Sequence, residues 1–159
     1  MKTSLLEQEL IDVVSALDGF DDRVFSVYNM DELEEKASIS GFPIVAIGFE
    51  RAVPSPGNQG VTAEGRTKTG SDDRMLVNKR FTIVVGVDYN WNGEGESGSR
   101  AVATDLLDDI RRALLGYVGV NKGRPWRFVG EGPTDTALAS VIFYAQTWET
   151  TTLITGGNA

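Results

Sequence analysis

The sequence of 159 residues contains no histidine and no cysteine. Without histidine the chain lacks the side chain that most often serves as a general base near neutral pH. Without cysteine it lacks a thiolate nucleophile and, with histidine also missing, the usual ligands of zinc and iron. The remaining carboxylate, lysine, tyrosine and hydroxyl groups form no recognisable catalytic pattern. These absences favour a protein that assembles over an enzyme.

Disulfides and long hydrophobic runs are missing as well. A chain without cysteine is compatible with a reducing compartment. No stretch approaches the roughly 20 apolar residues of a membrane span, and the first ten residues lack an apolar core of signal-peptide length. With 17.2 kDa and 41% hydrophobic residues, the chain can form the core of one domain. We expect a single soluble, intracellular domain over residues 1–159, with a flexible tail at 155–159.

The formal net charge of −8 is distributed unevenly. Residues 1–37 carry ten acidic and three basic side chains, whereas residues 51–80 carry six basic and three acidic ones. A strongly acidic protein is not expected to bind duplex DNA tightly, because phosphate binding depends on cationic side chains. Two interpretations of the asymmetry stay open. Both segments are solvated surfaces, or the acidic front of one copy meets the basic middle of another.

Two amphipathic helices are predicted from apolar residues at helical spacing. The first begins with Ser4 and Glu7, which have the spacing of a capping box, and ends before Asp18-Gly19. The second is capped by Ser99 or a neighbour and stops at Gly116, because glycine accommodates the backbone that ends a helix.

A third, short helix to Ala37 is predicted from Asp31 and Glu34. The predicted strands are Arg23–Tyr28, Pro43–Val53, Met75–Tyr89, Pro125–Val129 and Ala137–Thr151, with a turn over Gly130–Thr136. The polar segment Pro54–Asp73 lies between two good strands, so we interpret it as the tip of a long hairpin. The expected fold is α+β: an antiparallel sheet of about four to five strands, two helices packed on one face, and a long β-hairpin.

The strand faces predict which side of the sheet is buried. In Met75–Tyr89 the odd-numbered residues are apolar except Lys79. One face of this strand therefore belongs to the core, and the other is exposed to solvent or lies against a partner. In Ala137–Thr151 both faces are substantially apolar. We therefore expect the last strand to be central or covered on both sides.

One segment imitates part of a calcium-binding loop. Oxygen ligands at positions 1, 3 and 5 and a glycine at position 6 are what such a loop needs, and Asp88, Asn90, Asn92 and Gly93 supply them, followed by Glu94. Position 12 is a serine instead of the bidentate glutamate, and the loop follows a strand. A polar turn is the preferred interpretation, with Asp88, Asn90, Asn92 and Glu94 kept as calcium candidates. No other metal or cofactor is predicted.

Three carboxylates lie on or beside the second predicted helix. Asp105, Asp108 and Asp109 could support acid–base or metal chemistry, but Arg111 and Arg112 follow about one turn later. A solvated helix face is the preferred interpretation, with Asp108 paired to Arg112.

Contacts with other subunits are expected at charged and aromatic positions outside the predicted core. The long loop could be an arm that grips a neighbour, or a disordered insert. The interface candidates are Arg66, Lys68, Arg74, Lys79, Arg80, Trp91, Asp31, Glu34 and Glu35.

The order of elements resembles the tail terminator proteins of long-tailed bacteriophages, including the lambda tail terminator and related small tail-completion proteins. The segments that carry the resemblance are the opening helix with Leu6–Leu17, FPIVAIGFER, RFTIVVGVDYN, ATDLLDDIRRALLG, PWRF and ASVIFYAQTWETT. It covers about residues 4–152 and is a likeness of pattern, without a short signature motif. The calcium-like loop is a departure, since the family does not require one.

The resemblance implies a structural virion protein at the neck end of the tail, assembled in the host cytoplasm. Such a protein forms a homo-oligomeric ring, typically a hexamer, that caps the tail tube and later meets the head–tail connector. Subunits of a ring join through two different patches, and the charge asymmetry offers such patches. An acidic product also suits a channel that passes DNA without holding it. The alternatives are another tail or neck adaptor ring, a calcium-responsive binding module, or an enzyme acting through Asp105 and Asp109.

Overall fold

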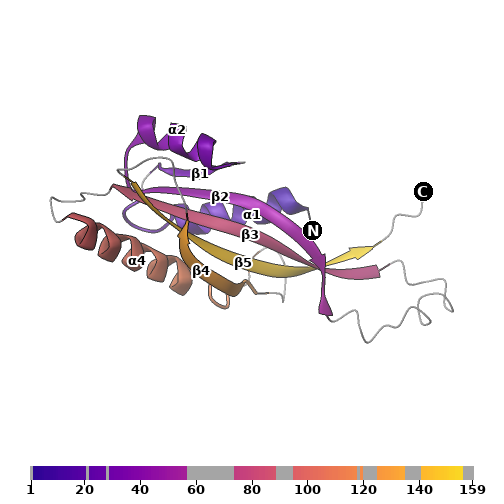
Figure 1. The fold of residues 1–159 in the computed structure, drawn as a ribbon. Coiled ribbons are helices and arrows are strands. Elements are labelled where there is room, and N and C mark those ends of the chain that lie inside the picture. Colours follow the sequence, from indigo (N-terminus) through magenta and orange to yellow (C-terminus); the bar gives the residue numbers. More distant parts are fainter. Residues whose placement is uncertain are drawn as a thin grey trace.

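The computed structural model describes residues 2–20, 22–27, 29–56, 74–88, 95–117, 119, 125–134 and 141–155. The elements are α1 (Thr3–Ser15), β1 (Val24–Ser26), α2 (Met30–Ser40), β2 (Ile44–Pro54), β3 (Arg74–Asp88), α4 (Gly95–Leu114), β4 (Arg127–Thr134) and β5 (Val141–Thr155). Within these residues, three helices pack on one five-stranded sheet (Figure 1). The predicted α+β class is confirmed. None of the described helices is long and apolar enough to span a bilayer.

The strand order in the sheet is β1-β2-β3-β5-β4. β1 runs parallel to β2, whereas the other neighbouring pairs are antiparallel. The sheet is therefore mixed but mostly antiparallel. β2 and β3 pair from Ile44↔Gly86 to Pro54↔Val77, as the predicted long hairpin requires, although residues 57–73 of its tip lie outside the described part. β5 lies between β3 and β4, which confirms its predicted central position.

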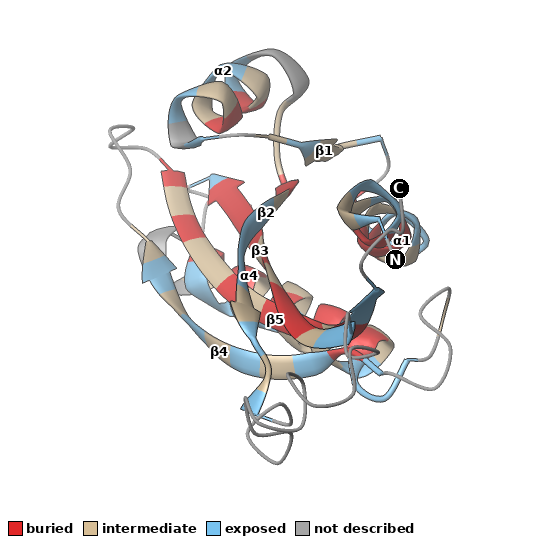
Figure 2. Cartoon of the chain, turned by 90° about the vertical axis from the view of Figure 1, so that its right-hand side faces the viewer, coloured by how far each residue is buried: buried red, intermediate tan, exposed pale blue. Residues whose placement is uncertain are grey.

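The helices cover both faces of the sheet. α1 and α4 pack on one face, which confirms the prediction of two helices on one side, and α2 packs on the other. Figure 2 shows the buried parts of β2, β3 and β5 between these helices. The larger core contains Leu6, Leu10, Val14, Phe20, Val45, Ile47, Phe81, Ile83, Val85, Val87, Ala103, Leu107, Ile110, Leu114, Trp126 and Trp148.

The alternation in β3 explains this core. Phe81, Ile83, Val85 and Val87 are fully buried, because every second side chain of a strand points to the same face. Lys79 shares this parity and is 7% exposed, and burial lowers the pKa of its ammonium group.

Gly86 is required on the opposite face of β3, beneath the smaller core under α2. A Cβ at this position would lie 2.4 Å from Cε1 of Phe143. The missing side chain lets Phe143, which is opposite Gly86 in the β3–β5 register, fill the space with its ring.

The predicted capping box of α1 is wrong. The helix begins at Thr3, with Lys2 as the N-cap residue and no side-chain cap. Because the helix starts two residues earlier than a Ser4 cap would allow, Ser4 lies within the first turn. Glu7 accepts a hydrogen bond from Ser26 Oγ, so a contact with β1 replaces the predicted local one.

The starts of the other two helices also differ from the predictions. Asn29 caps α2, and its side-chain oxygen accepts a hydrogen bond from the backbone N–H of Glu32 at 2.9 Å. Asparagine is as good an N-cap as aspartate, and Asp31 is left in the first turn. α4 begins at Gly95, so Ser99 is buried inside the helix and does not cap it. The stop at Gly116 is confirmed by its φ of 73°.

The last two strands are longer than predicted. β4 continues to Thr134 through most of the predicted Gly130–Thr136 turn, with a register shift between Phe128 and Gly130. Pro133 is tolerated because β4 lies at the edge of the sheet. β5 runs to Thr155, so the predicted flexible tail begins inside a strand, and residues 156–159 lie outside the described part.

Candidate functional site

Three strands continue beyond the part of the sheet that their neighbours pair with. β1 pairs with β2 only over Val45–Ile47, and β4 pairs with β5 only over Phe143–Glu149. The distal ribbon, as we name it, consists of residues 51–54 of β2, 74–80 of β3 and 149–155 of β5. Figure 1 shows these strand ends at the far end of the sheet from α2. Its base is buried at Val77, Asn78, Lys79, Thr150 and Thr152, whereas residues 74, 75 and 153–155 are exposed, so a partner can reach the ribbon at its tip.

The tip of the distal ribbon exposes large apolar side chains. Met75, Leu153 and Ile154 are 38%, 44% and 40% exposed. Met75 lies directly opposite Ile154 in the β3–β5 register, so the two side chains form one apolar pair on the same face. Arg74 is exposed at the adjacent position. Exposed apolar side chains grouped in this way are typical of contact sites.

The base of the distal ribbon is held by a buried carboxylate. Glu149 is 2% exposed, and its Oε2 accepts a hydrogen bond from Arg80 Nε at 2.8 Å. Its Oε1 pairs with Arg127 of β4 and accepts a bond from Asn78 Nδ2 at 3.4 Å, while Thr151 Oγ1 donates to Asn78 Oδ1 at 2.7 Å. This network joins β3, β4 and β5 where the ribbon leaves the sheet, and it was not predicted.

The structure gives the basic interface candidates different environments. Arg80 belongs to the Glu149 network, and Lys79 is buried on the face that carries α1 and α4. Arg74 remains exposed at the tip. Arg66, Lys68 and Trp91 lie outside the described residues. Of the basic candidates that are described, only Arg74 is presented at the ribbon tip.

The acidic candidates lie on α2 at the other end of the sheet. Leu33 and Ala37 are buried against the sheet, whereas Asp31 and Glu35 are exposed and Glu34 is partly exposed. We call the outer side of α2 with these three carboxylates the acidic surface. Its charge is opposite to that of Arg74 at the ribbon tip.

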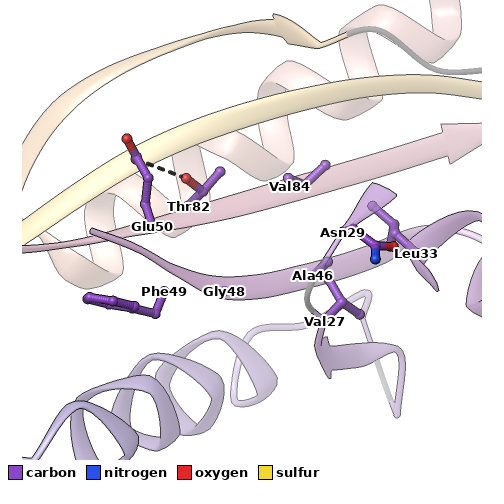
Figure 3. Close-up of a pocket in the computed structure, with 9 residues that line it drawn as sticks. All are labelled: Val27, Asn29, Leu33, Ala46, Gly48, Phe49, Glu50, Thr82 and Val84. Atoms are coloured by element: carbon purple, nitrogen blue, oxygen red, sulfur yellow. Dashed lines mark hydrogen bonds between the residues drawn. The ribbon is translucent and has the colours of Figure 1, made fainter. Parts of the chain in front are cut away.

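A cavity of about 240 Å³ opens beside α2 (Figure 3), and we name it the β2 pocket. Its lining residues are Val27, Asn29, Leu33, Ala46, Gly48, Phe49, Glu50, Thr82 and Val84. Thr82 Oγ1 donates a hydrogen bond to Glu50 Oε2 at 3.2 Å. A Cβ at Gly48 would lie 2.8 Å from the carbonyl oxygen of Val27. Glycine at position 48 therefore allows the backbone at Val27, just after β1, to approach β2 closely.

A second cavity of about 450 Å³ lies beside α1. It is lined by Leu5, Gln8, Glu9, Asp12, Tyr117 and Gly119. Glu9 is 7% exposed and accepts a hydrogen bond from Trp126 Nε1 at 3.0 Å. A Cβ at Gly119 would lie 2.4 Å from Glu9 Oε1, so a larger residue there would have to displace the Glu9 carboxylate. Glu9 thus ties α1 to Trp126, next to β4, which the sequence did not indicate.

Asp108 and Asp109 form ion pairs on the surface of α4, and Asp105 is exposed. Arg111 pairs with Asp108 and also with Glu131 of β4, and Arg112 pairs with Asp109 at 3.4 Å. The predicted pairing of Asp108 with Arg112 is wrong, because both pairs form at the i,i+3 spacing. The described residues hold no group of three or more ligating side chains that could bind a metal ion.

The calcium-like loop is described at its first position and again from Gly95, where α4 begins. Asp88 is the exposed last residue of β3, and Asn90, Asn92 and Glu94 lie outside the described part. No protein-family model and no curated protein matches the sequence.

Proposed function

We propose that the chain is a structural virion protein, a tail terminator that forms a ring, caps the tail tube and ends its polymerisation. The ring then provides the joining surface for the head–tail connector or neck protein. The observation that carries the proposal is the presence of two chemically unlike surfaces at opposite ends of one sheet. The distal ribbon is apolar and basic at its tip, whereas the surface of α2 is acidic.

Unlike surfaces favour head-to-tail association. A contact between different patches repeats from copy to copy, and it closes into a ring when the rotation between copies closes. The N-terminal half of α2, which carries the acidic residues, meets the sheet near Gly48 and Thr82, because Asn29 and Leu33 line one pocket with them. Met75 at the ribbon tip is seven residues from Thr82 along β3, or about 23 Å at about 3.3 Å per residue. That separation keeps one chain from satisfying both surfaces by itself.

The charge of the chain supports a passage for DNA that does not retain it. The net charge is −8, and tight binding to phosphates requires an excess of cationic side chains at the contact. In this proposal the protein has no catalytic role and works at the neck end of the virion tail, after assembly in the host cytoplasm. The ring, which we propose to be a hexamer, follows from the resemblance in element order.

The proposal is tested by the size and symmetry of the purified protein. Light scattering after size-exclusion chromatography and negative-stain images should reveal a closed ring, alone or with purified tail tube. Addition of the protein to polymerising tubes should stop their growth at a fixed length. A monomer at every concentration, both alone and with tube present, would contradict the proposal.

Two alternatives predict different results. Another tail or neck adaptor ring would form a ring but leave tube length unchanged. A calcium-responsive module using Asp88, Asn90, Asn92 and Glu94 would release or absorb heat when titrated with calcium at millimolar concentration. For a tail terminator, the calcium titration should give no heat of binding, and calcium should not change the size of the protein.

A further inference from the structure

We propose that the β2 pocket of one copy receives the Met75–Ile154 pair from the distal ribbon of a second copy. This inference rests on the proposed ring and identifies the contact that builds it. The pocket and the apolar pair are separate features of the chain, so the contact is head to tail.

The chemistry of the β2 pocket suits apolar side chains. At about 240 Å³ it is smaller than the roughly 300–1,000 Å³ typical of small-molecule sites. Val27, Leu33 and Val84 contribute apolar walls. The polar lining groups already have partners, since Thr82 donates to Glu50, and Asn29 accepts from the backbone of α2. An apolar occupant therefore leaves these hydrogen bonds in place.

The tip of the distal ribbon supplies such an occupant. Met75 and Ile154 stand side by side on neighbouring strands and are both more than one third exposed. Methionine is flexible enough to fit an irregular cavity. The tip cannot enter the pocket of its own chain, because Met75 and Thr82 are seven residues apart on one strand, or about 23 Å.

Charge complementarity identifies the occupant as a second copy of this chain. Arg74 is exposed next to Met75, and Asp31 and Glu35 are exposed on α2, the helix that contributes Leu33 to the pocket. Docking of the tip therefore brings a guanidinium group toward carboxylates while apolar side chains leave water. The charge attraction and the burial of apolar side chains both favour association.

Cysteine cross-linking tests this contact without background, because the chain contains no cysteine. In the variant Thr82→Cys/Ile154→Cys, the pocket cysteine of one copy should form a disulfide with the tip cysteine of the next. Mild oxidation should give a ladder of covalent multimers. The matched control is Thr134→Cys/Ile154→Cys, because Thr134 is a partly exposed threonine on the same face of the sheet that does not line the pocket. The control should remain largely uncross-linked.

Mixing two blocked variants tests the direction of the contact. Thr82→Tyr fills the pocket, and Met75→Asp/Ile154→Asp makes the tip acidic. Each variant alone should lose the ring, while a mixture should form a one-to-one dimer and nothing larger, because each chain retains one working surface. Leu115→Asp, which changes an apolar side chain 65% exposed elsewhere, should assemble like the wild type.

The outcomes separate this inference from the proposed function. If the wild type forms a ring and the tip variant does so equally well, the pocket contact is wrong and the ring stands. Equal cross-linking of the pocket and control cysteines leads to the same conclusion. If the wild type never forms a ring, the proposed function fails together with the contact. The tip variant alters exposed side chains only, so it remains informative even if Thr82→Tyr does not fold.

Discussion

Replacement of Glu149 by glutamine should weaken the whole fold, because this carboxylate joins three strands at the base of the distal ribbon. The side chain is 2% exposed and interacts with Arg80, Arg127 and Asn78. Glutamine has the same shape but no charge, and its amide group would face the guanidinium donors. The substitution therefore removes the charge and leaves the packing almost unchanged.

The expected loss follows from the exposure of the partners. Removing one member of a buried ion pair costs about 3–5 kcal/mol when its partner stays buried. Here Arg80 is 26% exposed and Arg127 is 66% exposed, so water replaces part of the lost interaction. We expect Glu149→Gln to lower the free energy of unfolding by about 2–3 kcal/mol, close to the range for charged hydrogen bonds. This corresponds to a Tm about 4–12 °C lower.

Chemical and thermal unfolding followed by circular dichroism measure this effect. Arg127→Ala is the matched control: since its side chain is mostly exposed, its loss should cost less than about 1 kcal/mol. Arg80→Ala should fall between the two. A Glu149→Gln protein within about 0.5 kcal/mol of the wild type would refute the reasoning, because changes of that size are typical of surface positions.

Three further predictions concern other buried contacts. Trp126→Phe removes the hydrogen bond to Glu9 and should cost about 1–3 kcal/mol in urea unfolding; an unchanged midpoint would contradict this role. Gly86→Ala places a methyl group against Phe143 and should lower the free energy of unfolding by about 1–3 kcal/mol through overpacking. A neutral result would show that the aromatic ring of Phe143 can move away. Burial lowers the pKa of Lys79 below its usual value of 10.5, so the unfolded chain binds more protons between the two pKa values, and stability should rise with pH across that window. Lys79→Met should remove this rise, and a pH profile identical to that of the wild type would argue against it.

Much of the fold could be predicted because hydrophobic periodicity depends on local sequence. The alternation in β3 identified Phe81, Ile83 and Val85 as core residues, and the two apolar faces of β5 indicated its central position. Helix starts were less predictable. Ser4 had the right spacing for a cap, but tertiary contacts start α1 earlier and direct Glu7 to Ser26.

The candidate site depends on contacts that sequence spacing cannot reveal. Glu149 and Arg80 are 69 residues apart in the sequence, so no local pattern indicates that they form an ion pair. For the same reason the sequence predicts Arg80 and Lys79 as interface candidates together with Arg74, although of these three only Arg74 is presented at the tip. The β2 pocket did leave one local signal. Gly48 interrupts a strand of larger residues, and an isolated glycine in a strand indicates close approach of another backbone.

The two proposed docking regions are built on the same continuous strands, and this has a consequence for the size of the assembly. In a ring joined through them, the distance from one neighbour to the next depends on strand length and not on a hinge or a loop. Two extra residues in each of β2, β3 and β5 would preserve the alternation of faces and lengthen each subunit by about 7 Å. The circumference of such a ring would then depend on the number of residues per strand, and wider or narrower rings could be obtained by changing that number in pairs.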